Sequence, residues 1–232
     1  MTIRLLLLAF VFVASALPAT AQDRIERILA GKVLRVGTTM DTPVFSMRNA
    51  ATGQLEGFDM DALATLSQAL GGVKVEYVKM TFGTMLPDLL ADKFDIAMSG
   101  MGRTLDRARV ATFSRPYMRY GKLLLIRAAD KDKYHSLEDL DKAGLKIAHN
   151  MGGLNERFAK VRFKNATPTG YASNELAFAD LIDGKADAQV ADSTSAVYLA
   201  AKDPRVVVMN LQNVFDPVYV AILVRREDQT LL

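Results

Sequence analysis

The sequence contains no cysteine and no tryptophan, and its only histidines are His135 and His149. Without cysteine the chain can form no disulfide and has no thiolate for nucleophilic or redox chemistry, so burial must hold the fold together. No acidic residues are spaced around the two histidines as metal ligands would be, which argues against metal catalysis. We therefore expect neither a metal nor a cofactor.

A long hydrophobic run stands at the N-terminus, where Arg4 precedes the apolar stretch Leu5–Leu17 and Ala19, Thr20 and Ala21 follow. This is the pattern of a secretory signal peptide over residues 1–21, with the mature chain beginning at Gln22. An uncleaved anchor is the alternative, but the run is too short and wrongly flanked for a membrane span. No cysteine follows the run, so no lipid anchor is expected there. We expect a periplasmic protein.

Charge of one sign is not in large excess either. The chain has 29 Lys and Arg against 26 Asp and Glu, a formal net charge of +3, and loss of Arg4 with the leader reduces it to +2. This is too little to indicate nucleic acid as a partner. The 211 residues beyond position 21 suffice for one large domain or two small ones.

The first half of the mature chain alternates expected strands and helices. A short amphipathic helix at 23–30 precedes strands at 32–37, 73–78 and 94–98, helices at 57–70 and 81–91, and a hairpin turn at 49–53. The order β, α, β, α, β indicates a mostly parallel sheet. Ligands bind such sheets beyond the carboxyl ends of the strands. The corresponding loops here are 38–43, 80–84 and 99–107.

A second unit of the same kind follows an apolar strand at 121–127 and a capped short helix at 136–141. It contains expected strands at 145–149, 167–171, 186–191 and 205–209, and helices that open at 150–156, at 174 and at 193. A last apolar strand is expected at 219–224. The chain therefore resembles two related α/β lobes with two crossings between them.

The stretch 94–107 contains residues that are typical of a carboxylate-binding site. Ser99, Gly100 and Gly102 follow the strand 94–98 directly, and Thr104 precedes Arg107 by three residues, as an N-cap does at a helix start. Exposed amides and hydroxyls at a strand end, with a guanidinium beside them, form a suitable carboxylate site. The alternative is an ordinary strand-to-helix corner with a surface arginine.

Several motifs occur together in the order of one family. They are Gly57-Phe-Asp-Met-Asp61, Phe94-Asp-Ile-Ala-Met-Ser-Gly100, Thr104-x-x-Arg107, Phe113-Ser-x-Pro-Tyr117 and Asp183-Gly-Lys-Ala-Asp187 with Asp192. From residue 25 to about 224 the chain resembles the periplasmic solute-binding proteins of amino-acid ABC transporters, solute-binding protein family 3. The resemblance implies a type II periplasmic-binding-protein fold, with two α/β lobes joined by two hinge strands. Lobe 1 would comprise 22–120 and 215–232, and lobe 2 would comprise 121–214.

The same resemblance implies roles for individual residues. Arg107 would pair with the α-carboxylate of an amino acid, helped by backbone groups from Ser99 through Gly100 to Gly102, and Asp192 would hold the α-ammonium. Phe82 would cover one side of the solute, Asp41 would reach its side chain, and Gly153 and Leu154 would offer amides from the other lobe. Each residue has an ordinary alternative: Arg107 solvated, Asp192 a simple N-cap, Phe82 core filling. Gly102 departs from the hydroxyl residue of many relatives.

Within the family the motifs look most like the cyclohexadienyl dehydratase branch, which dehydrates prephenate or arogenate. That branch carries a catalytic glutamate three residues after the aspartate that matches Asp192, and this chain has Ser195 there. A serine hydroxyl cannot replace a carboxylic acid with a raised pKa as proton donor. An enzyme would need another group, such as Glu156 or His149, to take over.

The expected function is therefore capture of an amino acid or similar small carboxylate for an ABC permease in the inner membrane, by a protein expected to be a monomer. The alternatives are a dehydratase and a periplasmic sensor module. In relatives about two more helices follow the last strand and pack on lobe 1. We expect the sequence to be shortened at its C-terminal end relative to them.

Overall fold

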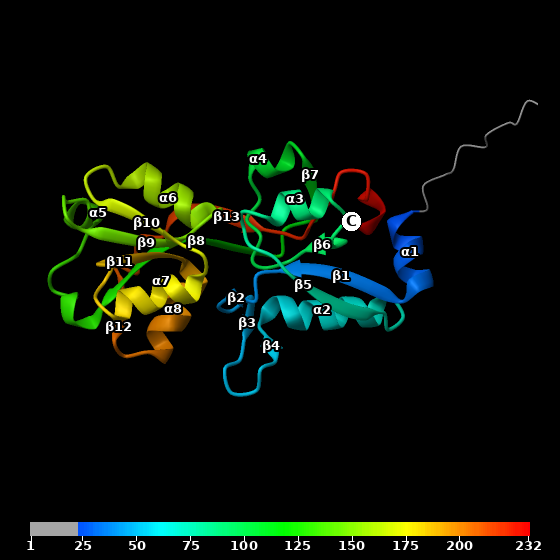
Figure 1. Cartoon of the computed structure of the whole chain (residues 1–232), viewed down its shortest axis with the longest axis horizontal. Helices are drawn as coiled ribbons and strands as arrows, with labels where there is room; N and C mark the ends of the chain where they lie inside the picture. Colours follow the sequence, from blue (N-terminus) through cyan, green and yellow to red (C-terminus); the bar gives the residue numbers. More distant parts are fainter. Residues whose placement is uncertain (1–22) are drawn as a thin grey trace, which may run out of the picture.

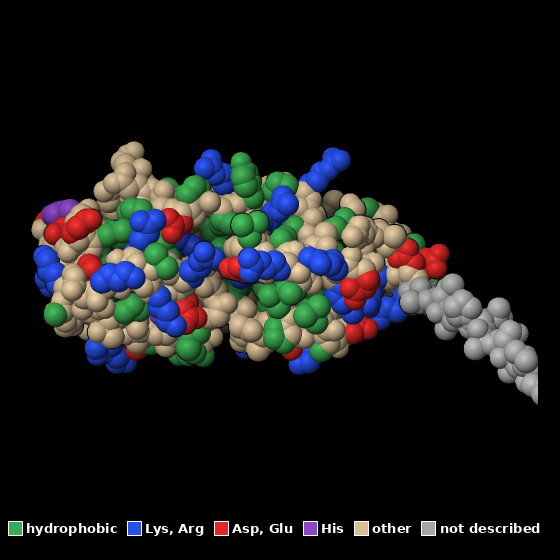
Figure 2. Space-filling view, turned by 90° about the horizontal axis from the view of Figure 1, so that it is seen from above, with side chains coloured by type: hydrophobic (Ala, Val, Ile, Leu, Met, Phe, Trp, Pro, Cys, Tyr) green, Lys and Arg blue, Asp and Glu red, His purple; other side chains and the backbone are tan. Residues whose placement is uncertain are grey.

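The computed structural model describes residues 23–232, so the expected signal peptide at 1–21 lies outside the described residues. Two α/β lobes lie next to each other along the long axis of the molecule (Figure 1). The expected two-lobed α/β fold is confirmed. No helix in the described part of the chain has the length and hydrophobicity to span a membrane. Basic and acidic side chains are interspersed over both lobes on the face shown in Figure 2.

Lobe 1 is built on a five-stranded sheet with the strand order β5-β1-β6-β14-β7. Strands β1, β5 and β6 are parallel, whereas β14 runs antiparallel to both β6 and β7. The strands of this sheet are β1 (Val33–Thr38), β5 (Lys74–Lys79), β6 (Ile96–Ala97), β7 (Ala111–Phe113) and β14 (Leu223–Arg225). Its helices are α1 (Arg24–Gly31), α2 (Phe58–Ala69), α3 (Met85–Leu90) and α4 (Leu105–Ala108), with a 3₁₀ turn η2 (Gln229–Leu231).

The lobe 1 sheet has a hydrophobic cluster on each face, because its central strands are buried on both sides. Val36 and Ile96 pack with Leu63 of α2, and Ala97 packs with Leu89 of α3. A small three-stranded sheet, β2 (Asp41–Thr42), β3 (Ser46–Arg48) and β4 (Leu55–Glu56), projects beside α2 (Figure 1).

Lobe 2 is built on a second sheet, with the order β10-β9-β11-β8-β12 and β13 paired to β8. Along β8, Leu124 and Ile126 join the cluster on one face of this sheet while Leu123 and Leu125 join the cluster on the other, as the two-residue period of a strand requires. The strands are β8 (Met118–Arg127), β9 (Lys146–Asn150), β10 (Thr167–Tyr171), β11 (Ala188–Asp192), β12 (Val206–Met209) and β13 (Phe215–Val220). The helices are α5 (Leu137–Leu140), α6 (Leu154–Arg162), α7 (Asn174–Ile182) and α8 (Ser193–Lys202), with a 3₁₀ turn η1 (Ala128–Asp130).

Two antiparallel strands, β8 and β13, connect the lobes. Val218 and Val220 of β13 pair with Tyr120 and Met118 of β8, and the register shifts between Phe215 and Val218. The strand expected at 219–224 is in fact two strands, since β13 stays with the lobe 2 sheet and β14 enters the lobe 1 sheet. The irregular pairing makes this the natural place for a hinge.

A network of arginines and aspartates joins the two chain ends of the described protein to lobe 1. Asp95 is 1% exposed and accepts from Arg24, Arg27 and Arg35, with an Arg24 distance of 3.0 Å. Arg225 lies 2.7 Å from Asp228, and Arg24 contacts this carboxylate as well. The network ties α1 to β1, to the loop before β6 and to the segment after β14.

Candidate functional site

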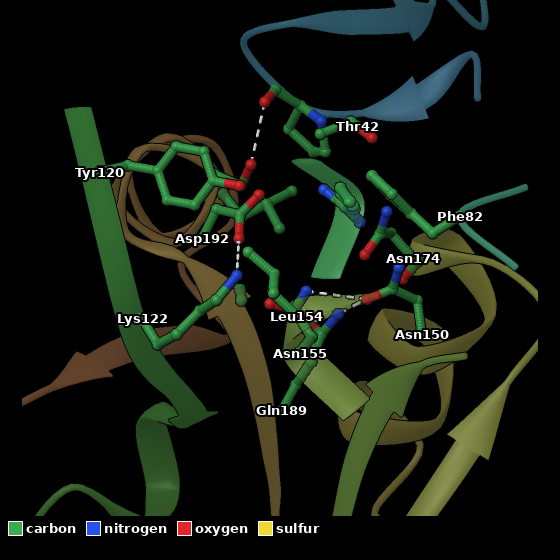
Figure 3. Close-up of a pocket in the computed structure, with 15 residues that line it drawn as sticks. Thr42, Phe82, Tyr120, Lys122, Asn150, Leu154, Asn155, Asn174, Gln189 and Asp192 are labelled. Atoms are coloured by element: carbon green, nitrogen blue, oxygen red, sulfur yellow. Dashed lines mark hydrogen bonds and ion pairs between the residues drawn. The ribbon is translucent and has the colours of Figure 1, made fainter. Parts of the chain in front are cut away.

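A small cavity lies between the lobes, enclosed by residues from both (Figure 3). Its volume is ≈ 20 Å³, so a solute of amino-acid size enters only when the lobes part or side chains move. Lobe 1 and the connecting strand β8 contribute Thr42, Pro43, Phe82, Arg107, Tyr120 and Lys122. Lobe 2 contributes Asn150, Leu154, Asn155, Asn174, Gln189, Ala191, Asp192, Ser195 and Leu199.

Arg107 reaches the cavity because the start of α4 is fixed locally. The Thr104 hydroxyl accepts from the Arg107 amide at 3.2 Å, the N-cap that the sequence predicts. The guanidinium is only 7% exposed and donates from Nη1 to the Gly102 carbonyl at 2.9 Å. Arg107 is therefore not a solvated surface arginine. Burial lowers its pKa, and Tyr120 and Asp192 oppose that change.

Asp192 faces the same cavity from the end of β11, and its carboxylate forms a buried ion pair with the Lys122 ammonium (Figure 3). It stands at the N-cap position of α8, yet its side chain makes no capping hydrogen bond. Lys122 is 3% exposed, and burial lowers its pKa while the Asp192 charge acts in the opposite direction. The Lys122 ammonium also lies 5.0 Å from the centre of the Tyr120 ring, a cation–π contact.

Phe82 and Leu154 also line the cavity, from opposite lobes. The Phe82 side chain lies 3.3 Å from where a Cβ on Gly153 would stand. Gly152 adopts φ +79°, and a Cβ there would come within 2.3 Å of the Gly83 amide nitrogen. The loops before α3 and α6 therefore touch backbone to backbone, an approach that glycine alone permits.

Four further residues expected at the site, Ser99, Gly100, Gly102 and Gly153, are not among those that line the cavity. Ser99 is fully buried, and its hydroxyl bonds those of Thr39 and Ser46 at 2.8 and 2.7 Å. Gly100 donates its amide to Asp59 at 2.8 Å and accepts from the Tyr120 hydroxyl at 3.0 Å. The Gly102 carbonyl accepts from Arg107. We call Ser99, Gly100 and Gly102 the floor of the site. The Ser99 hydroxyl, the Gly100 amide and carbonyl, and the Gly102 carbonyl already have protein partners.

Contacts between the lobes hold the closed conformation. Asp41, expected at the solute, instead accepts from the Asn174 amide at 2.9 Å and lies outside the lining of this cavity. Ser195 does line the cavity, and its hydroxyl donates to the Pro43 carbonyl at 2.9 Å. At the rim, Arg157 and Asp106 lie 3.3 Å apart. Each contact joins lobe 1 to lobe 2, so opening the cleft must break all three.

A second buried carboxylate, Asp59 of α2, supports the floor of the site. It is fully buried and accepts from the Gly100 amide and from the Tyr117 hydroxyl, both at 2.8 Å. Burial raises the pKa of Asp59 to about 6, although these two hydrogen bonds act to lower it. No cation contacts this carboxylate among the described residues.

The raised pKa of Asp59 makes a contribution to stability that depends on pH. The folded protein holds a proton on Asp59 between its unfolded value of 3.8 and its folded value of about 6, so this group's contribution falls as pH rises through that window. Two pKa units correspond to about 3 kcal/mol. We expect Asp59→Asn to lose this term, so that its unfolding free energy relative to the native protein rises between pH 4 and 7. Urea unfolding of both proteins at several pH values measures the difference, and a difference independent of pH would contradict the assignment.

Sequence reasoning missed Lys122, because it stands inside a continuous apolar strand. A single charged residue among Leu123, Leu124 and Leu125 was the available signal, since an isolated buried lysine requires a partner. It also assigned no role to the amide side chains of Asn150, Asn155, Asn174 and Gln189, because a neutral amide side chain gives no charge signal in the sequence. Asn155 donates to the Asn150 side-chain oxygen at 2.8 Å (Figure 3).

Comparisons with known proteins identify the family and the fold of this chain. The family model described as bacterial extracellular solute-binding proteins, family 3, matches residues 34–232. The chain belongs to this family. Among solved structures, the ancestral amino acid-binding protein AncCDT-1, a precursor of cyclohexadienyl dehydratase, superposes with a TM-score of 0.83 at 37% identity, covering 89% of this chain and 88% of that one. Holo ArgBP from T. maritima gives a TM-score of 0.81 at 31% identity, with coverage of 89% and 88%.

Curated members of family 3 include an enzyme as well as binding proteins. Cyclohexadienyl dehydratase of Pseudomonas aeruginosa is 35% identical over 93% of this chain and 80% of its own length. The ABC transporter arginine-binding protein 1 of Escherichia coli is 25% identical over 88% of this chain and 82% of its own length. The fold is that of the type II periplasmic amino-acid-binding proteins.

Proposed function

We propose that this protein captures an amino acid or a similar small carboxylate between its lobes, in the periplasm, and delivers it to an ABC permease of the inner membrane. The single observation that carries the proposal is that Arg107 of lobe 1 and Asp192 of lobe 2 line one cavity between the lobes. A guanidinium pairs with a carboxylate in bidentate geometry. A buried guanidinium with one protein acceptor therefore suits an anionic solute.

Binding and release would proceed by rotation of the lobes about β8 and β13. We assign 22–120 with 215–232 to one moving body and 121–214 to the other. The paired strands β8 and β13 then lie at the boundary between the two bodies. Each closing contact from Asp41, Ser195 and Arg157 is single and polar. The exposed Arg157–Asp106 pair contributes little, and each of the two hydrogen bonds contributes about 1 kcal/mol. A bound solute that bridges the two lobes can therefore shift the balance between open and closed forms.

Titration calorimetry on the purified protein tests this function, after bound solute is removed by partial unfolding and refolding. We expect one solute per chain from a panel of the common amino acids and small carboxylates. The heat should be accompanied by a rise in melting temperature, because binding to the folded state alone stabilises it. If the refolded protein binds no member of the panel, the proposed function is wrong.

The match to cyclohexadienyl dehydratase makes dehydration the second candidate function. The cavity supplies one carboxyl, Asp192, and this group is paired with Lys122. Glu156 accepts from the Gly152 amide and from Lys160, and its pKa is lowered by these bonds. Neither Glu156 nor His149 is among the residues that line the cavity. Among the described residues, the lining of the cavity therefore contains no unpaired carboxyl that could act as the proton donor for dehydration. An absorbance assay for the formation of phenylpyruvate from prephenate decides between the two functions.

A further inference from the structure

The charges that face the cavity do not balance. Its lining includes two cations, Arg107 and Lys122, and one carboxylate, Asp192, which leaves one positive charge. Burial raises the pKa of Tyr120 well above its usual range, so this phenol is neutral. Asp41 and Glu175 do not line this cavity and instead line two neighbouring ones. Asp216 shares a further cavity with Lys122, but its charge is paired with Arg162. An enclosed unbalanced charge is costly, so the solute that fits is a net anion.

A zwitterionic amino acid supplies no net charge, so it leaves the positive charge of the cavity unbalanced. Asp192 is already paired with Lys122. The Gly102 carbonyl accepts from Arg107, and the Pro43 carbonyl accepts from Ser195. An ammonium bound to Asp192 would therefore lie beside the Lys122 ammonium, and two like charges in an enclosed site repel each other.

Two neutral acceptors in the cavity wall do have free capacity. The side-chain oxygens of Asn155 and Gln189 are buried and have no hydrogen-bond partner among the described residues. Gln189 is 1% exposed and Asn155 is 6% exposed, and both line the cavity. A buried amide oxygen without a donor costs free energy, and a solute hydroxyl can supply that donor without adding charge.

We infer that the solute is a small hydroxycarboxylate: a monoanion with a carboxylate for Arg107, at least one hydroxyl, and no amino group. This inference rests on the proposed function, whose solute class it narrows. Arg107 neutralises the carboxylate, and Lys122 remains with Asp192. The hydroxyl donates to the free amide oxygens of the lobe 2 wall.

Matched sets of solutes on one carbon skeleton test the inference by titration calorimetry. One set is L-lactate, pyruvate and L-alanine, and the others are the 2-hydroxy, 2-oxo and 2-amino acids with the leucine and phenylalanine skeletons. For the skeleton that binds, we expect the hydroxy acid to bind most tightly. The amino acid should bind at least about tenfold more weakly, which is about 1.4 kcal/mol.

Two variants test whether Lys122 sets this preference. Lys122→Met frees Asp192 and brings the cavity charge to zero, so the amino acid should gain on the hydroxy acid by about tenfold or more. The double variant Lys122→Met with Asp192→Asn restores one positive charge and removes the ammonium acceptor. It should regain the preference for the hydroxy acid. Circular dichroism melting shows whether each variant folds. If Lys122→Met does not fold, the double variant alone is compared with the native protein.

The outcomes separate the inference from the function on which it rests. Hydroxy-acid preference in the native protein, with reversal in Lys122→Met, supports the inference. An amino acid that binds the native protein as tightly as its hydroxy analogue overturns the inference and leaves the proposed function standing. If no solute of the three sets binds, the inference is wrong, and the proposed function is then decided by the full panel of amino acids and small carboxylates.

Discussion

Replacing Arg107 with alanine is expected to weaken solute binding by about 100-fold or more, because removal of one partner of a buried charge pair costs about 2–5 kcal/mol. The guanidinium is buried, and its one hydrogen bond within the described protein goes to the Gly102 carbonyl. Its other N–H groups are therefore available to a solute carboxylate. Calorimetry with the tightest solute of the native protein measures the loss.

The same substitution should leave the solute-free protein at least as stable as the native one. Arg107 faces no carboxylate in a hydrogen bond, so its burial is a cost to folding that alanine removes. Arg109→Ala is the matched control, since that side chain is 80% exposed and lies two residues away. We expect its binding and melting temperature to be unchanged. Binding by Arg107→Ala within threefold of the native affinity would show that the carboxylate lies elsewhere.

Replacing Asp95 with alanine should produce the second large effect, a loss of about 3–5 kcal/mol in the free energy of unfolding, as expected when one partner of a buried ion network is removed. Asp95 accepts from the Arg35 amide at 2.9 Å and from its guanidinium at 2.8 Å, in addition to Arg24 and Arg27. The substitution leaves three guanidinium groups with fewer partners. Urea unfolding gives the change, and Asp132→Ala serves as the control because Asp132 is an exposed acid.

The contribution of Asp95 to the free energy of unfolding should change with pH in the opposite direction to that of Asp59. Burial raises the pKa of Asp95, but the hydrogen bonds from Arg35 and the charge of Arg27 outweigh it and lower the pKa below the usual value. The stabilisation is therefore present above the unfolded value of 3.8 and is lost as pH falls through the lower folded value. The Asp95→Ala deficit should shrink in acid, and a deficit that stays constant down to pH 2 would contradict the network.

Features set by neighbours along the chain could be predicted from the sequence. The Thr104 cap and the cap of the short helix expected at 136–141 both form, since their partners lie within one helical turn. The second cap is a capping box between Ser136 and Asp139. The helix expected at 81–91 begins only at Met85, because Thr81 and Thr84 bond each other's hydroxyl and amide groups, and such local bonds compete with the helix.

Features that depend on distant partners could not be predicted in the same way. Lys122 meets an aspartate 70 positions away, and Asp59 meets an amide 41 positions away. The acids of α2 fit a helix start equally well without burial, so nothing local distinguishes Asp59 from Asp61. The short strand β7 was missed because Ala111–Phe113 is too brief to show a period.

The place of β14 in the lobe 1 sheet has a consequence for the order in which the molecule can assemble. Leu223 and Val224 lie between β6 and β7, two strands made more than a hundred residues earlier. All strands of the lobe 2 sheet except β13 come from one continuous stretch, 118–209. During synthesis lobe 2 therefore has most of its sheet available first, whereas the lobe 1 sheet lacks the strand between β6 and β7 until β14 has been made. Closing so long a loop is slow, and the nascent first lobe depends on protection from aggregation until it closes.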